Sequence, residues 1–201
     1  MRIVTDEVEA YSLAQTTPPP AHLQALSEET VATQECPQML TGPVEGRLLE
    51  TLVWVAQPKL IVELGTYSGY SAQFMAAALP EDGRLITCEL DPDRAQFARE
   101  RFRDPRIEIR VGPALDTLAT IDGPIDLAFI DADKGGYPGY YDAVVPKLSA
   151  RGLIVADNTL HGGGALEGDL MHDFNEHVRA DPRTVSVLLP VRDGVTLIRR
   201  A

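Results

Sequence analysis

Short apolar runs alternate with helical patterns along most of the chain, and this alternation is the feature that most constrains the fold. From residue 59 onward, β-rich runs such as "KLIVELG", "RLITCEL" and "GLIVADN" are each followed by a segment with helical periodicity. The runs are continuously apolar, as in strands that are covered on both faces. Strand–helix alternation of this kind predicts a parallel, doubly wound α/β sheet with helices on both faces.

The boundaries of the expected elements follow from these patterns. Parallel strands are expected at residues 59–65, 84–90, 106–112, 125–131 and 152–158. Helices are expected at residues 70–79, 92–102, 114–119, 137–148 and 166–180. Two last strands, 184–190 and 195–200, are separated by only four residues. Because that gap is too short for a crossover helix, and Asp193-Gly194 supplies turn residues, these two strands are expected to be antiparallel.

The first part of the chain has a different character. Residues 5–15 are expected to form a first amphipathic helix, and the prolines of "TTPPP" then interrupt the chain. Further helices are expected at 21–34 and 42–57, the last ended by Pro58. We therefore predict one domain over residues 1–201, in which a helical segment (1–57) covers the active site of an α/β core (58–201).

Composition and charge exclude several classes of protein. The 201 residues are 44% hydrophobic and 24% charged, which suits one domain with a real core. A net charge of −12 argues against nucleic acid and against an anionic membrane surface as partners. No run of about 18 apolar residues is present, and acids occupy the N-terminal stretch where a signal peptide would be apolar, so we expect a cytoplasmic protein. The two cysteines, Cys36 and Cys88, lack the spacing of a zinc site.

The loop after the first strand is the first candidate for ligand binding. In "VELGTYSGYS", Gly65 and Gly69 form a G-x-x-x-G pattern and not the G-x-G-x-x-G pattern of dinucleotide sites. Glu63 precedes the turn and no basic residue lies in the loop, which favours a sulfonium cation over a pyrophosphate. Glu89 ends the second strand, where an acid can accept both ribose hydroxyls of an adenosine. Glu89 alone fits nicotinamide cofactors and S-adenosylmethionine equally well, but Glu63 and the terminal hairpin favour S-adenosylmethionine.

Acidic and amide side chains end two later strands and form the second candidate. Asp131 follows the run 125–130, and Asp157 with Asn158 follows the run 153–156. Three such oxygen ligands suit Mg²⁺, which keeps its other positions for substrate and water. Lys134 follows Asp131 by three residues and is expected to point the same way. A divalent cation disfavours the charged form of a neighbouring lysine, so Lys134 is a candidate base.

Six stretches together resemble the cation-dependent O-methyltransferases of the caffeoyl-CoA and catechol type. They are "VELGTYSGYSA", "LPEDGRL", "VGPALDTL", "FIDADKGGYPGYY", "VADNTLHGG" and "DPRTVSVLLPVRDGVTLIRR". The resemblance covers residues 35 to the C-terminus and implies a Rossmann-like class I methyltransferase fold, whose seven-stranded sheet has an antiparallel last strand. It also implies methyl transfer from S-adenosylmethionine to a hydroxyl of a vicinal-diol aromatic molecule, a Mg²⁺ cofactor and a homodimer.

The resemblance also implies roles for individual residues. The metal ligands would be Asp131, Asp157 and Asn158, with Lys134 as the base. The residues at the cofactor would be Glu63, Gly65, Thr66 and Ser71 in the loop, Met39 and Thr41 closing over it, Glu89 at the ribose, Ala114 at the adenine, and Asp131 with Asp133 near the cofactor.

This sequence departs from the plant members of the family at the acceptor side. Those members have a longer insertion after "DNTLWN", whereas here "DNTLHGGGAL" leads directly into a helix. Gly162 stands where they have a substrate-contacting Asn, His161 replaces their Trp, and residues 1–58 contain no Lys. These differences favour a small free phenolic acceptor over a CoA thioester.

Three alternatives stay open at this point. A nicotinamide-dependent oxidoreductase shares the fold class but prefers a phosphate-binding loop. A Mg²⁺-binding phospho-receiver also uses strand-end acids and a lysine, although its acids cluster at the first and third strands. A non-catalytic cofactor-binding module on the same fold would not need the complete set of three oxygen ligands and Lys134.

Overall fold

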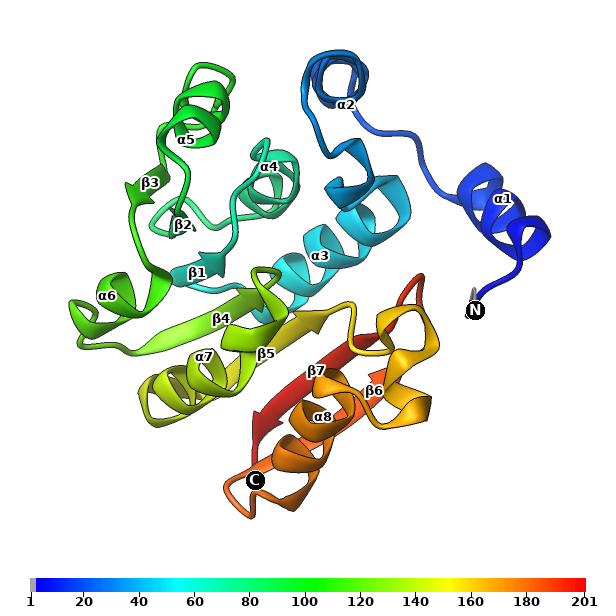
Figure 1. Ribbon diagram of the computed structural model, residues 1–201. Helices are drawn as coiled ribbons and strands as arrows, with labels where there is room; N and C mark the ends of the chain where they lie inside the picture. Colours follow the sequence, from blue (N-terminus) through cyan, green and yellow to red (C-terminus); the bar gives the residue numbers. More distant parts are fainter. Residues whose placement is uncertain (1–2) are drawn as a thin grey trace.

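A computed structural model of the protein, which describes residues 3–201, contains one twisted seven-stranded sheet (Figure 1). The strand order is β3-β2-β1-β4-β5-β7-β6. The strands are β1 (Leu60–Leu64), β2 (Arg84–Glu89), β3 (Ile107–Val111), β4 (Ile125–Ile130), β5 (Leu148–Asp157), β6 (Thr184–Leu189) and β7 (Val195–Arg200). Neighbours among β1 to β5 pair in parallel, and β7 pairs antiparallel with both β5 and β6. The predicted parallel sheet with an antiparallel last strand is confirmed.

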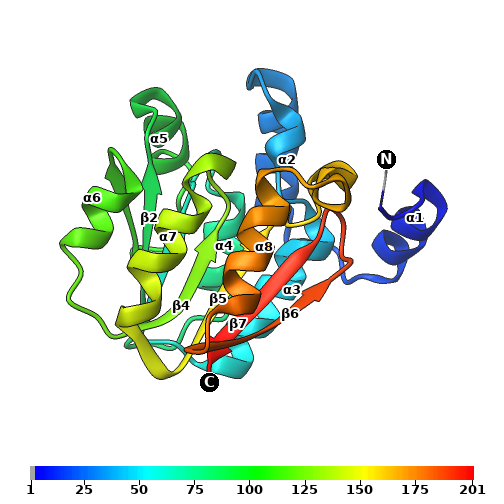
Figure 2. The same cartoon turned by 60° about the horizontal axis from the view of Figure 1, so that its bottom comes forward.

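Helices flank both faces of this sheet (Figures 1 and 2). The α-helices are α1 (Asp6–Gln15), α2 (Ala21–Thr33), α3 (Pro43–Ala56), α4 (Tyr70–Ala77), α5 (Pro92–Arg99), α6 (Ala114–Ala119), α7 (Tyr137–Val144) and α8 (Leu170–Ala180). Short 3₁₀ helices are η1 (Pro37–Met39), η2 (Lys134–Gly136), η3 (Val145–Lys147) and η4 (His161–Glu167). None of the helices in residues 3–201 is long and apolar enough to cross a bilayer.

Two apolar layers hold the helices to the sheet. On one face, Leu49 of α3 and Met75 of α4 join side chains of the strands in one buried cluster. On the other face, Tyr137 and Tyr141 of α7 and Phe174 of α8 do the same. All five residues of β1 are buried, as expected for a central strand covered on both sides. This rigid sheet fixes the positions of the loops at the carboxyl ends of its strands.

The two first helices differ in how they contact the core. Leu23 and Leu26 of α2 pack against Tyr70 and Phe74 of α4. Helix α1 lies at the edge of the molecule, and none of its residues is buried (Figure 2). The expected amphipathic character of α1 is therefore wrong, because its apolar side chains, including Tyr11, stay exposed.

Several predicted boundaries shift where glycine or proline changes the backbone. Strand β5 begins at Leu148, four residues earlier than expected, and its register with β4 shifts between Ile125 and Leu127. Helix α7 gives way to η3 next to Pro146, since proline has no N–H to continue the α-helical hydrogen bonds. Helix α8 begins at Leu170 and not at 166, because the glycine-rich η4 precedes it.

Candidate active site

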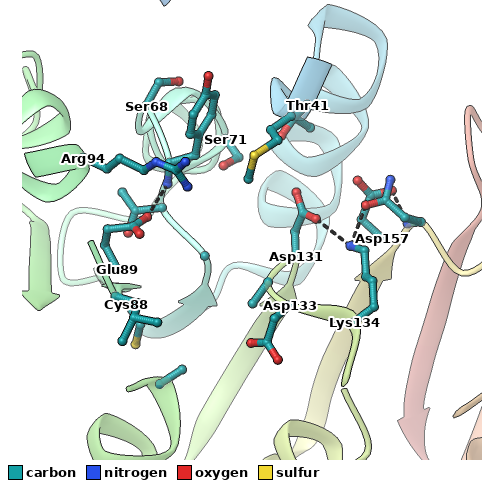
Figure 3. Close-up of a pocket in the computed structure, with 18 of the residues that line it drawn as sticks. Thr41, Ser68, Ser71, Cys88, Glu89, Arg94, Asp131, Asp133, Lys134 and Asp157 are labelled. Atoms are coloured by element: carbon teal, nitrogen blue, oxygen red, sulfur yellow. Dashed lines mark hydrogen bonds and ion pairs between the residues drawn. The ribbon is translucent and has the colours of Figure 1, made fainter. Parts of the chain in front are cut away.

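A cavity of about 570 Å³ opens at the carboxyl ends of the strands, beside β1 and β4, where the strand order reverses (Figure 3). Ligands of doubly wound sheets bind at this position. The predicted site residues that line the cavity are Met39, Thr41, Gly65, Thr66, Ser71, Glu89, Ala114, Asp131, Asp133, Lys134, Asp157 and Asn158. Glu63 is the one predicted site residue that is not part of the cavity wall. Residues predicted in two separate candidate sites thus share one cavity.

Gly65 brings the loop after β1 close to the end of β4. Its φ of 103° lies in the region that favours glycine, and a Cβ there would stand 2.0 Å from the carbonyl oxygen of Asp131. Gly69 also has a positive φ and caps the N-terminus of α4. The G-x-x-x-G pattern therefore serves close backbone approach as well as the tight turn into the helix.

Glu89 is held by backbone amides at the end of the cavity where the adenosine is predicted, here named the adenosine end. Its Oε2 accepts a hydrogen bond of 2.8 Å from the Tyr67 N–H, and its Oε1 accepts one of 3.1 Å from the Asp91 N–H. The Arg94 guanidinium lies over the ring of Tyr67, 5.5 Å from the centroid. Because each carboxylate oxygen has a further lone pair, Glu89 keeps acceptor capacity for ligand hydroxyls.

Glu63 lies directly behind the wall of the cavity. Its Oε1 accepts a hydrogen bond of 2.6 Å from the Ser71 hydroxyl, and Ser71 itself lines the cavity. Burial raises the pKa of Glu63 to about 8, and the hydrogen bond from Ser71 opposes this shift only in part. A nearby cationic ligand would favour the ionised carboxylate.

Lys134 contacts two of the three predicted metal ligands at the other end of the cavity. Its Nζ donates to Asp131 Oδ1 at 3.1 Å (Figure 3). It also donates to Asn158 Oδ1 at 2.6 Å and to the Tyr137 hydroxyl at 2.7 Å. The Tyr137 hydroxyl lies 2.9 Å from the carbonyl oxygen of Asp157 and so connects β5 to the same group. The helical turn expected between the two residues is absent, since η2 begins only at Lys134 and Asp133 is extended; a bend at Ala132 brings the two side chains together instead.

Asp157 is the most deeply buried acid of this group. It is 1% exposed, and its Oδ1 accepts a hydrogen bond of 2.6 Å from the Asn158 N–H. Burial raises the pKa of Asp157 to about 6, with a second contribution from the charge of Asp131. Clustered carboxylates of this kind are unfavourable by themselves and call for positive charge between them.

The donor set fits a hard divalent cation. Two carboxylates and one amide oxygen are ligands that Mg²⁺ prefers, and the Lys134 ammonium now lies between Asp131 and Asn158 as a cation would. Within residues 3–201, no group of three or more His, Cys, Asp or Glu side chains is arranged to hold a metal. A cation held by Asp131 and Asp157 would therefore need Asn158 as its third protein ligand.

The family model for O-methyltransferases matches residues 14–201. The chain belongs to this O-methyltransferase family. A caffeoyl-CoA O-methyltransferase of Mesembryanthemum crystallinum is 32% identical over 185 residues, which cover 81% of this chain and 73% of the relative. A catechol O-methyltransferase of Niastella koreensis is 40% identical over 147 residues, covering 69% of this chain and 66% of the relative.

Solved structures agree with this assignment. The SAH-bound methyltransferase PaMTH1 of Podospora anserina superposes with a TM-score of 0.92 at 30% identity, covering 98% of this chain and 94% of the other. An SAH-bound O-methyltransferase of Bacillus cereus has a TM-score of 0.88 at 27% identity, covering 97% of each chain. The predicted family, the class I methyltransferase fold and the enzyme class, an S-adenosylmethionine-dependent O-methyltransferase, are confirmed.

Two features of the methyltransferase cavity were missed from the sequence. Tyr140 lines the cavity, and its hydroxyl donates a hydrogen bond of 2.5 Å to Asp133 Oδ1. In "YPGYY", Tyr140 follows Tyr137 by three residues, and this helical spacing could have indicated that both side chains lie on the same face of the helix. Arg192, whose Nη1 lies 2.7 Å from Glu45 Oε2, also lines the cavity. These two residues are 147 positions apart, so no local pattern connects them.

The histidines of the methyltransferase lie away from the cavity wall. His161 Nδ1 is 2.5 Å from Asp169 Oδ2, so this side chain joins η4 to the cap of α8. His172 and His177 are exposed on α8, as expected, and His177 Nε2 is 3.0 Å from Asp142 Oδ1.

Proposed function

We propose that this methyltransferase transfers a methyl group from S-adenosylmethionine to one hydroxyl of a small vicinal-diol aromatic molecule, with a divalent cation as second cofactor. The observation that carries the proposal is the convergence of Asp131 and Asn158 on the Lys134 Nζ, at 3.1 and 2.6 Å. This cluster shares one cavity with Glu89, at which we place the cofactor ribose. The arrangement suits a metal-dependent reaction at one end and adenosine binding at the other.

Different parts of the cavity wall would hold the two cofactors. Asp131, Asp157 and Asn158 would hold Mg²⁺, while the loop of Gly65, Thr66 and Ser71 would surround the methionine part of S-adenosylmethionine. Ala114 and Asp133 would lie at the adenine side, and Met39 and Thr41 would cover the cofactor. When bound, S-adenosylmethionine supplies an electrophilic methyl group and the cation supplies positive charge that favours ionisation of an acceptor hydroxyl.

Lys134 is the base that we assign to the reaction. Its Nζ would take the proton of the acceptor hydroxyl as the new O–CH₃ bond forms and the S–CH₃ bond breaks. The Lys134 side chain is 21% exposed, so it can pass this proton to solvent. The Tyr137 hydroxyl, 2.7 Å from Nζ, keeps the lysine at this position in the absence of an acceptor. The remaining contribution of the protein is orientation of the reactants and charge neutralisation.

The acceptor that we propose is a free catechol or a related small polyphenol. An octahedral cation held by three protein ligands has three further positions, of which two vicinal hydroxyls would fill two and a water the third. The sequence around residues 158–170 is short, and Gly162 carries no side chain that would contact a long acceptor. We further propose a homodimer, on the habit of the family, which sedimentation of the purified protein would test.

The decisive experiment is a methylation assay with caffeic acid and S-adenosylmethionine. We expect methylated product in the presence of Mg²⁺, detected by mass spectrometry, and none in the presence of EDTA. Product that is insensitive to EDTA would contradict the metal site. Tight binding of S-adenosylhomocysteine without product from any catechol would contradict the proposed acceptor and leave the cofactor placement intact.

A further inference from the structure

A four-residue segment forms one wall of the cavity and has few attachments of its own. Gln38, Met39, Leu40 and Thr41, here named the covering segment, all line the cavity. The backbone hydrogen bonds of this segment are local, from Met39 N–H to the Cys36 carbonyl and from Leu40 N–H to the Pro37 carbonyl. These bonds form the turn η1 but do not place it over the cavity.

Arg192 joins the covering segment to the other end of the chain. Its guanidinium donates to the carbonyl oxygen of Thr41 and, at 3.3 Å, to that of Leu40. Within residues 3–201, these are the hydrogen bonds that tie residues 38–41 to an element outside their own turn. Arg192 lies in the turn between β6 and β7, so it is carried by the sheet. The hydrogen-bonded attachment of residues 38–41 is therefore made by one side chain on a rigid support, in addition to the packing of Leu40 against the buried cluster of α2 and α4.

Glu45 fixes the orientation of that side chain. Its Oε2 lies 2.7 Å from Arg192 Nη1, and Glu45 itself is fully buried in the first turn of α3. Arg192 is only 26% exposed, so the pair is shielded from solvent. A buried ion pair with further hydrogen bonds to carbonyl oxygens has a well-defined geometry, and loss of one partner leaves an uncompensated charge.

The covering segment is held from its other side as well. The Tyr67 hydroxyl donates a hydrogen bond of 3.0 Å to the carbonyl oxygen of Cys36, just before η1. Tyr67 belongs to the loop that follows β1, and its own N–H donates to Glu89. The segment thus spans the cavity between the adenosine end and the terminal hairpin. Figure 3 shows Thr41 on this span, facing the space that Asp131 and Asp157 also border.

We propose that Arg192, oriented by Glu45, is a positioning residue that keeps the covering segment closed over S-adenosylmethionine. This inference rests on the placement of the cofactor proposed above. Arg192 would act on cofactor affinity through residues 40–41 and would not contact the reacting atoms. Three of its five N–H donors are engaged by Glu45 and by the carbonyl oxygens of Leu40 and Thr41, and these contacts join the covering segment to α3 and the terminal hairpin.

The test measures S-adenosylhomocysteine affinity by calorimetry and hydrogen exchange of the peptide that contains residues 36–42. Arg192→Met removes the donors at similar length, and we expect about a tenfold loss of affinity together with faster exchange of this peptide. The double variant Glu45→Gln/Arg192→Met avoids an uncompensated buried carboxylate and should show the same loss. Its melting temperature should stay closer to the wild-type value than that of Arg192→Met, which separates closure from misfolding.

Two further variants complete the experiment. Arg192→Lys keeps the charge but not the fork of donors, so it should recover the pairing with Glu45 and only part of the affinity. Glu176→Gln/Arg179→Met is the matched control, since this Arg–Glu pair lies on the outer face of α8, where Arg179 is 70% exposed. We expect that control to bind S-adenosylhomocysteine with wild-type affinity.

The results separate the two proposals. Wild-type affinity and unchanged exchange of residues 36–42 in Arg192→Met would overturn the role of Arg192. In that case, weaker S-adenosylhomocysteine binding by a Glu89→Gln variant would still support the proposed placement of the cofactor. If Glu89→Gln also bound with wild-type affinity, the cofactor would lie elsewhere and both proposals would fall.

Discussion

The two ends of the cavity are built in different ways. At the adenosine end, the Glu89 carboxylate is fixed by the backbone N–H groups of Tyr67 and Asp91. At the acceptor end, side chains hold one another, with the Lys134 ammonium between Asp131 and Asn158. Backbone donors are set by the fold and stay in place with or without a ligand, whereas a cluster of mobile charges depends on the cation at its centre.

This difference predicts that the two ends fail separately. Removing a ligand of the metal should stop the reaction without preventing cofactor binding, because no metal ligand supports Glu89. Damage at Gly65, where the loop after β1 touches the Asp131 carbonyl, should instead affect both ends together. Substitutions at the two ends and at their point of contact therefore test the comparison directly.

The largest effect is expected for Asp157→Ala. Asp157 is buried at the end of β5, and its loss removes one of the proposed metal ligands. Mg²⁺-dependent methylation should fall by roughly a thousandfold or more, as loss of several kcal/mol of charge stabilisation implies. Calorimetry should still detect S-adenosylmethionine binding. Loss of S-adenosylmethionine binding together with activity would place Asp157 at the cofactor and would contradict the assignment of the two ends.

Lys134→Ala should have the next largest effect. A general base contributes on the order of a hundredfold or more, so kcat should fall by at least about that factor. The affinity for S-adenosylhomocysteine should change little, since Lys134 contacts Asp131, Asn158 and Tyr137 and not the adenosine end. Equal losses of turnover and of cofactor affinity would rule out the role of Lys134 as base. Lys59→Ala is the control for removal of a lysine, because the Lys59 side chain is 76% exposed and pairs with Asp82 at the surface.

Gly65→Ala should damage both ends through the backbone. Its φ of 103° is strained for alanine, and the new Cβ would overlap the Asp131 carbonyl. We expect a loss of about 2–3 kcal/mol in unfolding free energy, measured by denaturant titration, together with weaker cofactor binding. Gly135→Ala is the matched control, because an added Cβ there meets no atom within 4 Å. If both variants were equally stable, the proposed role of Gly65 in connecting the two ends of the cavity would be contradicted.

The sequence predicted what depends on local pattern. Apolar runs marked β1, β2, β4 and β5, whereas the alternating sequence of β3 is that of an edge strand. The short gap before Val195 marked the antiparallel β7, since period and connection length are local properties. The strand-end positions of Asp131 and Asp157 placed both in one cavity, because parallel strands share one carboxyl edge. The early start of β5 was missed, since its pairing with β4 contains a register shift that no periodicity announces.

What the sequence could not supply were contacts between distant side chains. The pairing of Glu45 with Arg192 joins residues 147 positions apart and depends on how α3 meets the terminal hairpin. The exposure of α1 could not be predicted from the sequence either. Apolar residues show that a helix can be buried, but they do not show that another surface is available to cover that helix.

The smallest predicted effect is the release of a proton from Glu63 when the cofactor binds. Burial raises the pKa of Glu63 to about 8, so at pH 7 the free enzyme holds this carboxyl mainly protonated. Binding of a cationic cofactor next to Ser71 favours the carboxylate and should release a proton, close to one per site by the raised pKa. The affinity for S-adenosylmethionine should therefore increase as the pH rises from 6 to about 8 and then level off. Calorimetry in buffers of different ionisation enthalpy measures the released protons. Glu63→Gln should abolish both the release and the pH dependence, and an unchanged release in that variant would assign the proton to another group.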